Sequence, residues 1–398
     1  MQTGEYLVNS IFDEIVERKN TSSLKWDYCR QRFGREDILP MWVADMDFKS
    51  PTPITQAIIH RAEHGVFGYT EASERLSDVL AGWMKRRHNW LIDNKWVIYS
   101  PGVVTSVNTA ILAFTNPGDK VLMQTPIYYP FYSSISNNDR EVVTNPLINN
   151  NGIYEMDFSD LEKKLADNVK MFIFCSPHNP IGRVWKLNEL KEVIRLCRKY
   201  NVILVSDEIH SDLVLKGHKH IPIASLAAEA EFSNCITLTS PTKTFNIAGL
   251  TVSAAIITDA ELKRKFKSTL HKNGADMLNI FGLEAAYAAY AYCEPWLDEL
   301  LDYLEQNLDI MVEYFSKNIR RIKVIRPEAT YLAWLDCTDL PVAAEKLKEF
   351  FTYEAGVGLN DGITFGKEGS GFQRINFACP RPLLIEGLER IKTAVSKL

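Results

Sequence analysis

Three short, mainly apolar segments constrain the fold of this chain more than any other feature. They span residues 171–174, 202–205 and 235–239, and polar residues follow closely after each of them. Strands that are apolar throughout are buried on both faces, which is typical of a parallel sheet covered by helices. Further strand and helix patterns alternate along the chain, with strands at 96–99, 120–123 and 251–257 and helices at 53–63, 103–114 and 187–200. The sequence therefore predicts an α/β fold with a large, mostly parallel sheet sandwiched by helices.

The pattern changes after residue 279. A long helical segment at 282–317 is interrupted near Pro295, and mixed elements follow it, with strands at 322–325, 331–335 and 372–377 and helices at 342–353 and 382–396. A chain of 398 residues also exceeds the size at which a single hydrophobic core stops growing. We therefore predict two domains, a large one over 50–285 and a smaller α+β domain formed by 1–49 together with 286–398.

Composition narrows the classes of function. The formal net charge of -5 argues against nucleic acid as a ligand, and no apolar run is long enough to cross a membrane. The charged segment 13–19 does not read as part of a secretory signal, so we expect a cytoplasmic protein. The seven cysteines are scattered, without Cys-x-x-Cys spacing, which indicates buried reduced thiols rather than disulfides or a metal site.

Three functional side chains follow the three apolar strands. Asn179 lies after the first, Asp207 ends the second, and Lys243 comes shortly after the third. In such sheets, ligands bind beyond the carboxyl ends of the strands, so these side chains are expected to share one cleft. Alone, Asp207 could simply cap a turn and Lys243 could be solvated. Together, an amine for a Schiff base, a carboxylate for a ring nitrogen and an amide for a ring oxygen predict a pyridoxal 5'-phosphate (PLP) site.

A phosphate group needs donors at the start of a helix. A glycine-containing turn places the backbone N–H groups of Val103, Val104 and Thr105 at such a start, where the helix dipole favours an anion. The hydroxyl groups of Ser240 and Thr242 can add further donors. The turn alone is a weak signal, because many α/β loops resemble it.

Two further residues are candidates for the cleft. Tyr128 follows the strand at 120–123, where it could stack on a flat ring or equally belong to an aromatic cluster. Arg374 is a lone charge in the apolar strand 372–377. A buried arginine needs a carboxylate partner, and the bidentate pairing of a substrate α-carboxylate would supply one. Glu208 should point to the other side of its strand from Asp207, so we expect a structural role for it.

These motifs resemble the fold-type I PLP enzymes of the class I/II aminotransferase superfamily, and within it the MalY/PatB group of cysteine-conjugate and cystathionine β-lyases. The resemblance covers essentially the full length of the chain. Its most specific segments are 40–48 (PMWVADMDF), 67–69 (FGY), 176–182 (SPHNPIG), 206–212 (SDEIHSD), 240–243 (SPTK) and 374–377 (RINF). The first and fourth of these point to the lyase branch.

The resemblance implies a cofactor role for four of these positions. Lys243 would hold PLP covalently, and Asp207 would pair with the ring nitrogen. Asn179 would donate to the ring oxygen, and Tyr128 would stack on the ring.

The resemblance also implies a small-molecule amino-acid substrate and a homodimer with its active site at the subunit interface. Tyr69 would reach from one subunit toward the phosphate in the other. Arg374 would bind the substrate carboxylate, while Trp42, Ala44 and Asp45 would border the substrate entrance.

Two departures from the aminotransferase pattern weaken an aminotransferase assignment. His210 stands where those enzymes usually have a tyrosine near the ring oxygen, and Thr251 stands where many have a phosphate-binding arginine. The predicted function is cleavage of L-cystathionine or related L-cysteine S-conjugates to a thiol, pyruvate and ammonia. The alternative is an aminotransferase that acts on an L-amino acid and a 2-oxo acid, because the site motifs are common to both.

Two other classes fit the sequence poorly. A binding protein on a degenerate enzyme fold should have lost Lys243 or Asp207, and both are present. A dinucleotide-dependent dehydrogenase should carry Gly-x-Gly-x-x-Gly between a strand and a helix, and the chain has no such motif.

Overall fold

The computed structural model describes residues 10–227 and 230–398. Its largest sheet has the strand order β2-β10-β9-β8-β7-β3-β4. These seven strands are β2 (Val97–Ser100), β3 (Lys120–Thr125), β4 (Glu141–Pro146), β7 (Val169–Cys175), β8 (Ile203–Asp207), β9 (Cys235–Thr239) and β10 (Ser253–Ile257).

The seven-stranded sheet is mostly parallel, as predicted. Only β10 runs against its neighbours, since it pairs antiparallel with both β2 and β9, while the other adjacent pairs are parallel. Consequently β2, β3, β7, β8 and β9 all end at the same edge of the sheet.

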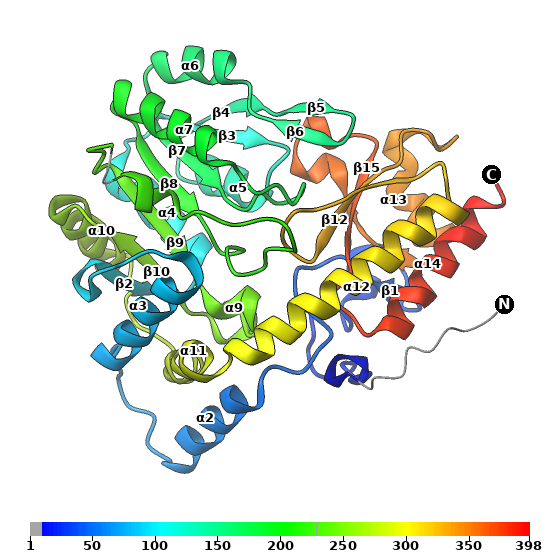
Figure 1. The fold of residues 1–398 in the computed structure, drawn as a ribbon, viewed down its shortest axis with the longest axis horizontal. Helices are drawn as coiled ribbons and strands as arrows, with labels where there is room; N and C mark the ends of the chain where they lie inside the picture. The colour runs from blue at the N-terminus through cyan, green and yellow to red at the C-terminus, as the bar shows by residue number, and fades with distance from the viewer. Residues whose placement is uncertain (1–9, 228–229) are drawn as a thin grey trace.

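Helices cover both faces of this sheet. Successive strand residues point to opposite sides, so strands that are apolar throughout present an apolar surface on each face. Met171 and Ile173 of β7 belong to one core cluster, and the alternate residues Phe172 and Phe174 belong to the other. The first cluster includes residues from α4 (Val103–Phe114), α5 (Pro130–Ser136) and α10 (Ala260–Lys272). The second includes residues from α3 (Glu74–His88), α6 (Phe158–Ala166), α7 (Leu187–Lys199), α8 (Ile223–Ala227) and α11 (Ile280–Tyr292). Figure 1 shows these elements around the strands.

A smaller domain contains the C-terminal part of the chain. Its antiparallel sheet has the order β11-β12-β15-β14. These strands are β11 (Lys323–Ile325), β12 (Leu332–Asp336), β14 (Asn360–Asp361) and β15 (Phe372–Asn376). The long helix α12 (Glu294–Asn318) extends from beside α11 to α14 (Arg381–Val395), as Figure 1 shows in yellow and red.

An N-terminal segment joins this smaller domain. Strand β1 (Leu39–Pro40) pairs in parallel with β13 (Val357–Gly358). The division at residue 285 stays a prediction, and residues 1–9 of the predicted small domain lie outside the described residues. The remaining elements are α1 (Cys29–Phe33), α2 (Thr52–Glu63), α9 (Pro241–Thr244), α13 (Leu347–Glu349), β5 (Ile148–Asn150) and β6 (Ile153–Glu155).

Two expected elements differ from the structure. The predicted helix at 342–353 is a 3-10 turn, the short α13 and a π-helical turn in succession. The predicted strand at 251–257 begins only at Ser253, because Thr251 adopts a left-handed backbone conformation with φ of 45°. The predicted break near Pro295 is confirmed, since α11 ends at Tyr292 and α12 begins at Glu294.

All seven cysteine side chains are buried, and none of them forms a disulfide bond. Among the helices described at 10–227 and 230–398, none is both long and apolar enough to cross a membrane.

Candidate active site

The shared edge of the parallel strands brings the predicted site residues together. A cleft of about 270 Å³ opens there, and its lining comes from the segments that follow β2, β3, β7, β8 and β9. The lining residues are Ala44, Pro101, Gly102, Val103, Val104, Thr105, Tyr128, Cys175, Asn179, Asp207, Ile209, His210, Thr242, Lys243 and Ala248. Nine of the eleven residues predicted to contact the cofactor are among them; Ser240 and Tyr69 are not.

Lys243 projects from the one-turn helix α9 into this cleft. Its side chain is half-buried, and its Nζ donates a hydrogen bond of 2.5 Å to the carbonyl oxygen of Ala44. Burial lowers the pKa of Lys243 to about 8, although the charge of Asp45 opposes the shift. At pH 7 about a tenth of the molecules therefore carry a neutral amine at this position, which is several hundred times more than for a solvated lysine.

Asp207 is buried at the end of β8. Its Oδ1 accepts one hydrogen bond, of 3.1 Å, from the backbone N–H of Ile209. Burial raises the pKa of Asp207 to about 7, and the neighbouring charge of Glu208 adds to the shift. Glu208 itself lies outside the cleft lining, where it accepts hydrogen bonds from His220 and from the backbone of Ile223. Asp207 forms no ion pair with any of the described residues, and a ligand cation could fill that role.

The first turn of α4 presents unused donors to the cleft. Gly102 is its N-cap residue and has no side chain to cap the backbone N–H groups of Val103, Val104 and Thr105. All four residues line the cleft. The start of a twelve-residue helix with uncapped amides is a ready site for an anion such as a phosphate.

The phosphate contact predicted for Ser240 stays a prediction. Ser240 is not among the residues that line the cleft; its hydroxyl donates to the carbonyl oxygen of Val252 at 2.6 Å and caps α9. The hydroxyl thereby stabilises the turn that carries Lys243. Thr242 does line the cleft, and its hydroxyl is 2.6 Å from that of Ser240.

Arg374 is buried on β15 without a protein carboxylate partner among the described residues. Its Nη1 donates to Asn179 Oδ1 at 2.8 Å, and its Nη2 donates to Asn360 Oδ1 at 2.6 Å and to the carbonyl oxygen of Trp42 at 3.1 Å. Its Nε is buried without an acceptor. Burial lowers the pKa of Arg374 to about 10, so the guanidinium remains charged at neutral pH. A substrate carboxylate would neutralise this charge.

The predicted entrance residues lie on a segment that bridges the lysine and the arginine. Trp42 contributes its carbonyl oxygen to Arg374, and Ala44 contributes its own to Lys243. The Asp45 side chain pairs with Arg18 at 2.8 Å. Ala44 lines the cleft with Lys243, whereas Trp42 and Asp45 line two neighbouring pockets.

Two aromatic side chains flank the cleft, and one predicted residue is absent from it. Tyr128 is half-buried, and burial raises its pKa to about 12. Burial, together with the charges of Lys243 and Arg374, lowers the pKa of His210 to about 3, so this ring is neutral at pH 7, and its Nδ1 has no hydrogen-bond partner among the described residues. Tyr69 is fully exposed and does not line the cleft of its own chain.

Three residues that position the site were not predicted from the sequence. The hydroxyl of Tyr331 donates to Ala44, and Asn360 accepts from Arg374. Asp212 accepts hydrogen bonds from Trp83 Nε1, His88 Nε2 and Thr244 Oγ1, which anchors the residue next to Lys243. Only Asp212 lay in a segment that the sequence singled out. The others come from distant parts of the chain, and no local pattern marks them.

The residues present fit PLP. The buried carboxylate of Asp207 lacks a cation, which a protonated ring nitrogen would supply. The uncapped start of α4 lacks an anion, which a phosphate would supply. Lys243 offers a partly neutral amine between these two features, and all of them line the same cleft.

Comparison with known proteins agrees with this chemistry. The sequence profile of aminotransferase class I and II matches residues 36–391. Cystathionine β-lyase PatB of Bacillus subtilis is 45% identical, with 97% of this chain and 100% of PatB covered. Protein MalY of Escherichia coli is 34% identical, with 96% and 98% covered.

A solved structure supports the fold over nearly the whole length. The crystal structure of cystalysin from Treponema denticola, which contains a PLP cofactor, superposes with a TM-score of 0.94 at 37% identity and covers 97% of this chain and 98% of its own. The chain therefore belongs to the class I and II aminotransferase family of PLP-dependent, fold-type I enzymes, in the branch that includes PatB and MalY.

Proposed function

We propose that this protein is a PLP-dependent carbon–sulfur β-lyase that cleaves L-cystathionine or related L-cysteine S-conjugates to a thiol, pyruvate and ammonia. The observation that carries the proposal is the convergence of Lys243, Asp207 and Asn179 in one cleft, next to Arg374, which has no carboxylate partner in the described part of the chain; PatB aligns with 97% of this chain.

The positions of the cleft residues support the following roles. Lys243 would hold PLP covalently, and Asp207 would pair with the ring nitrogen. Asn179 would donate to the ring oxygen, with His210 near it, and Tyr128 would stack on the ring. The amides of Val103, Val104 and Thr105 and the hydroxyl of Thr242 would hold the phosphate; all of these residues line the cleft.

When bound, PLP withdraws electrons from the bonds at the substrate's Cα, which makes the Cα proton acidic. Lys243 can accept this proton, because burial keeps part of its amine neutral and the Ala44 carbonyl positions it. Arg374 holds the substrate carboxylate and thereby fixes the direction of the Cα–H and Cβ–S bonds. Asp207, through its negative charge, keeps the ring nitrogen protonated. The thiolate leaves from Cβ, and water completes the release of pyruvate and ammonia.

An assay of two products separates the lyase from an aminotransferase. Purified protein is incubated with PLP and L-cystathionine in one reaction, and with an L-amino acid and 2-oxoglutarate in another. The lyase forms pyruvate in the first and no glutamate in the second. Glutamate formation without pyruvate would overturn the proposal, and Lys243→Ala serves as the inactive control.

We further propose a homodimer in which Tyr69 of each subunit reaches the phosphate end of the other cleft. Its complete exposure, beside the exposed apolar residues Val66 and Phe67, supports this role. Mixing Tyr69→Ala and Lys243→Ala variants tests it, because hybrid dimers then contain one intact site. Random reassociation should restore about a quarter of the wild-type activity. If Tyr69 served its own subunit, the mixture would stay inactive.

The cytoplasm is the compartment proposed for this enzyme, since seven buried free thiols suit a reducing environment. Activity measured in separated cell fractions tests this assignment.

A further inference from the structure

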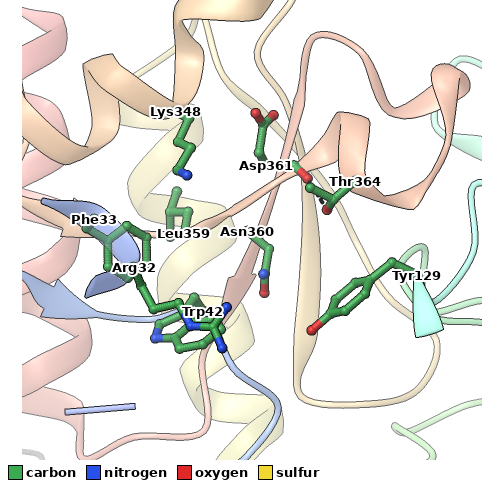
Figure 2. Close-up of a pocket in the computed structure, with 9 residues that line it drawn as sticks. All are labelled: Arg32, Phe33, Trp42, Tyr129, Lys348, Leu359, Asn360, Asp361 and Thr364. Atoms are coloured by element: carbon green, nitrogen blue, oxygen red, sulfur yellow. Dashed lines mark hydrogen bonds between the residues drawn. The ribbon is translucent and has the colours of Figure 1, made fainter. Parts of the chain in front are cut away.

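A second pocket, of about 320 Å³, lies next to the cleft and is drawn in Figure 2. Arg32 and Lys348 lie on one side of it, and Asp361, Thr364 and Tyr129 lie on the other. The remaining lining residues are Phe33, Trp42, Leu359 and Asn360.

This pocket adjoins Arg374, the proposed binding residue for the substrate α-carboxylate. The Nη2 of Arg374 donates to Trp42 and Asn360, which both line the pocket, whereas its Nη1 donates to Asn179, which lines the cleft with Lys243. Arg374 thus contacts residues that line the cleft and residues that line the pocket. A substrate held by its α-carboxylate at Arg374 can therefore extend its sulfur substituent into this pocket.

The charged side chains of the pocket lack ion-pair partners within the described part of the chain. Arg32 packs its guanidinium over the Trp42 ring, with Cζ 5.6 Å from the ring centroid. Lys348 is exposed at the mouth. Asp361 is half-buried, and its carboxylate accepts a hydrogen bond of 3.2 Å from Gln373 Nε2. Burial raises the pKa of Asp361, so a ligand cation beside it would offset the free-energy cost of burying its negative charge.

A third pocket beside Lys243 does not offer the same chemistry. Its residues Arg18, Asp45 and Asp47 are already ion-paired, with Arg18 2.8 Å from Asp45 and 2.6 Å from Asp47, and Lys25 2.6 Å from Asp47. A charged substituent gains less from groups that are already paired. The charges of the second pocket, which have no ion-pair partner among the described residues, are therefore better placed to recognise a charged leaving group.

We propose that Arg32, Lys348 and Asp361 form a subsite that selects L-cysteine thioethers whose leaving group carries both a carboxylate and an ammonium. Arg32 and Lys348 bind the carboxylate, and Asp361 binds the ammonium. This inference rests on the proposed lyase function. It assigns the preferred leaving group to an amino-acid thiol rather than to a short alkyl thiol.

Four substrates dissect the subsite. S-methyl-L-cysteine has an uncharged leaving group, S-(2-carboxyethyl)-L-cysteine carries only the carboxylate, S-(2-aminoethyl)-L-cysteine carries only the ammonium, and L-cystathionine carries both. Pyruvate formation yields kcat/KM for each. The wild-type enzyme should prefer cystathionine, with S-methyl-L-cysteine the poorest substrate.

Single substitutions should separate the two charges. Lys348→Gln should lower kcat/KM severalfold for the carboxyethyl substrate and cystathionine, since an exposed pair contributes modestly. Asp361→Asn should lower it about tenfold for the aminoethyl substrate and cystathionine, because Asp361 is more buried. Lys348→Glu should invert the preference between the two singly charged substrates. Lys346→Gln, in the same segment but outside the pocket, is the matched control.

The outcomes distinguish this inference from the function on which it rests. If the wild-type enzyme cleaves none of the four thioethers, the lyase function and the subsite both fail. If it cleaves S-methyl-L-cysteine, but the Lys348 and Asp361 variants change all four substrates equally or not at all, the lyase function stands and the subsite is wrong.

Discussion

Replacing Asp207 with asparagine should stabilise the cofactor-free protein at alkaline pH while weakening its affinity for PLP. The carboxylate is buried, and within the described residues its only hydrogen bond comes from the Ile209 N–H to Oδ1. Asparagine keeps that acceptor and removes the buried charge. Asp207 would thus stabilise the complex with PLP and destabilise the cofactor-free protein.

The expected magnitude follows from the pKa of Asp207, which burial raises from 3.8 to about 7. The folded protein holds the proton more tightly than the unfolded chain, so this group lowers stability as the pH rises from about 4 to 7. The penalty is complete above pH 7, where it reaches about 4 kcal/mol, and falls below about 2 kcal/mol at pH 5. For a chain of this length, 4 kcal/mol corresponds to a rise of about 5 °C in Tm.

Thermal unfolding of cofactor-free wild-type and Asp207→Asn proteins at pH 5 and pH 8 tests this reasoning. The gain in Tm should be larger at pH 8, and PLP titration should show affinity reduced by on the order of tenfold or more. Glu208→Gln is the matched control, because that buried carboxylate already accepts hydrogen bonds from three donors. It should lower stability by at least about 1 kcal/mol. A variant at Asp207 that is no more stable than wild type at pH 8 would refute the argument.

Three other substitutions test separate features. Gly182→Ala should cost at least about 2 kcal/mol of unfolding free energy in urea, because φ is 69° and an added Cβ would lie 2.3 Å from Pro327 Cβ; unchanged stability would contradict the close approach. Arg374→Lys should lower kcat/KM for thioether cleavage about a hundredfold, mainly through KM, because lysine lacks the planar fork; an unchanged KM would place the carboxylate elsewhere. Asp212→Asn should cost about 3 kcal/mol in denaturant unfolding, because the buried His88 loses its carboxylate 2.7 Å away; retained stability would show that this contact contributes little.

Much of the site was predictable because a buried parallel strand can be recognised from the apolar pattern of a few residues. Uniformly apolar segments predict parallel strands buried on both faces, and the carboxyl ends of such strands meet at one edge. That rule alone placed Asn179, Asp207 and Lys243 in the same cleft, where the structure has them. The unpaired charge of Arg374 was also foreseeable, since an arginine in an apolar strand must find a carboxylate.

Hydrogen-bond assignments of individual hydroxyls were not predictable. Ser240 precedes the lysine turn in a position that suits phosphate binding, yet its hydroxyl donates to Val252. That choice depends on a strand that approaches from further along the chain. The irregular turns at 344–354 likewise depend on packing against their surroundings, which overrides a helical pattern.

The sequence by itself determined which segments form the strands of the large sheet and which functional side chains follow those strands. Both can be read from the pattern of a few neighbouring residues. Only the tertiary structure decided the walls of the site. It brought Arg32 and Asp361 into one pocket with Asn360, which accepts a hydrogen bond from Arg374, and it placed the carbonyl of Ala44 against Lys243. Ala44 and Lys243 are 199 positions apart, and such a contact forms only when the separate elements pack into one core.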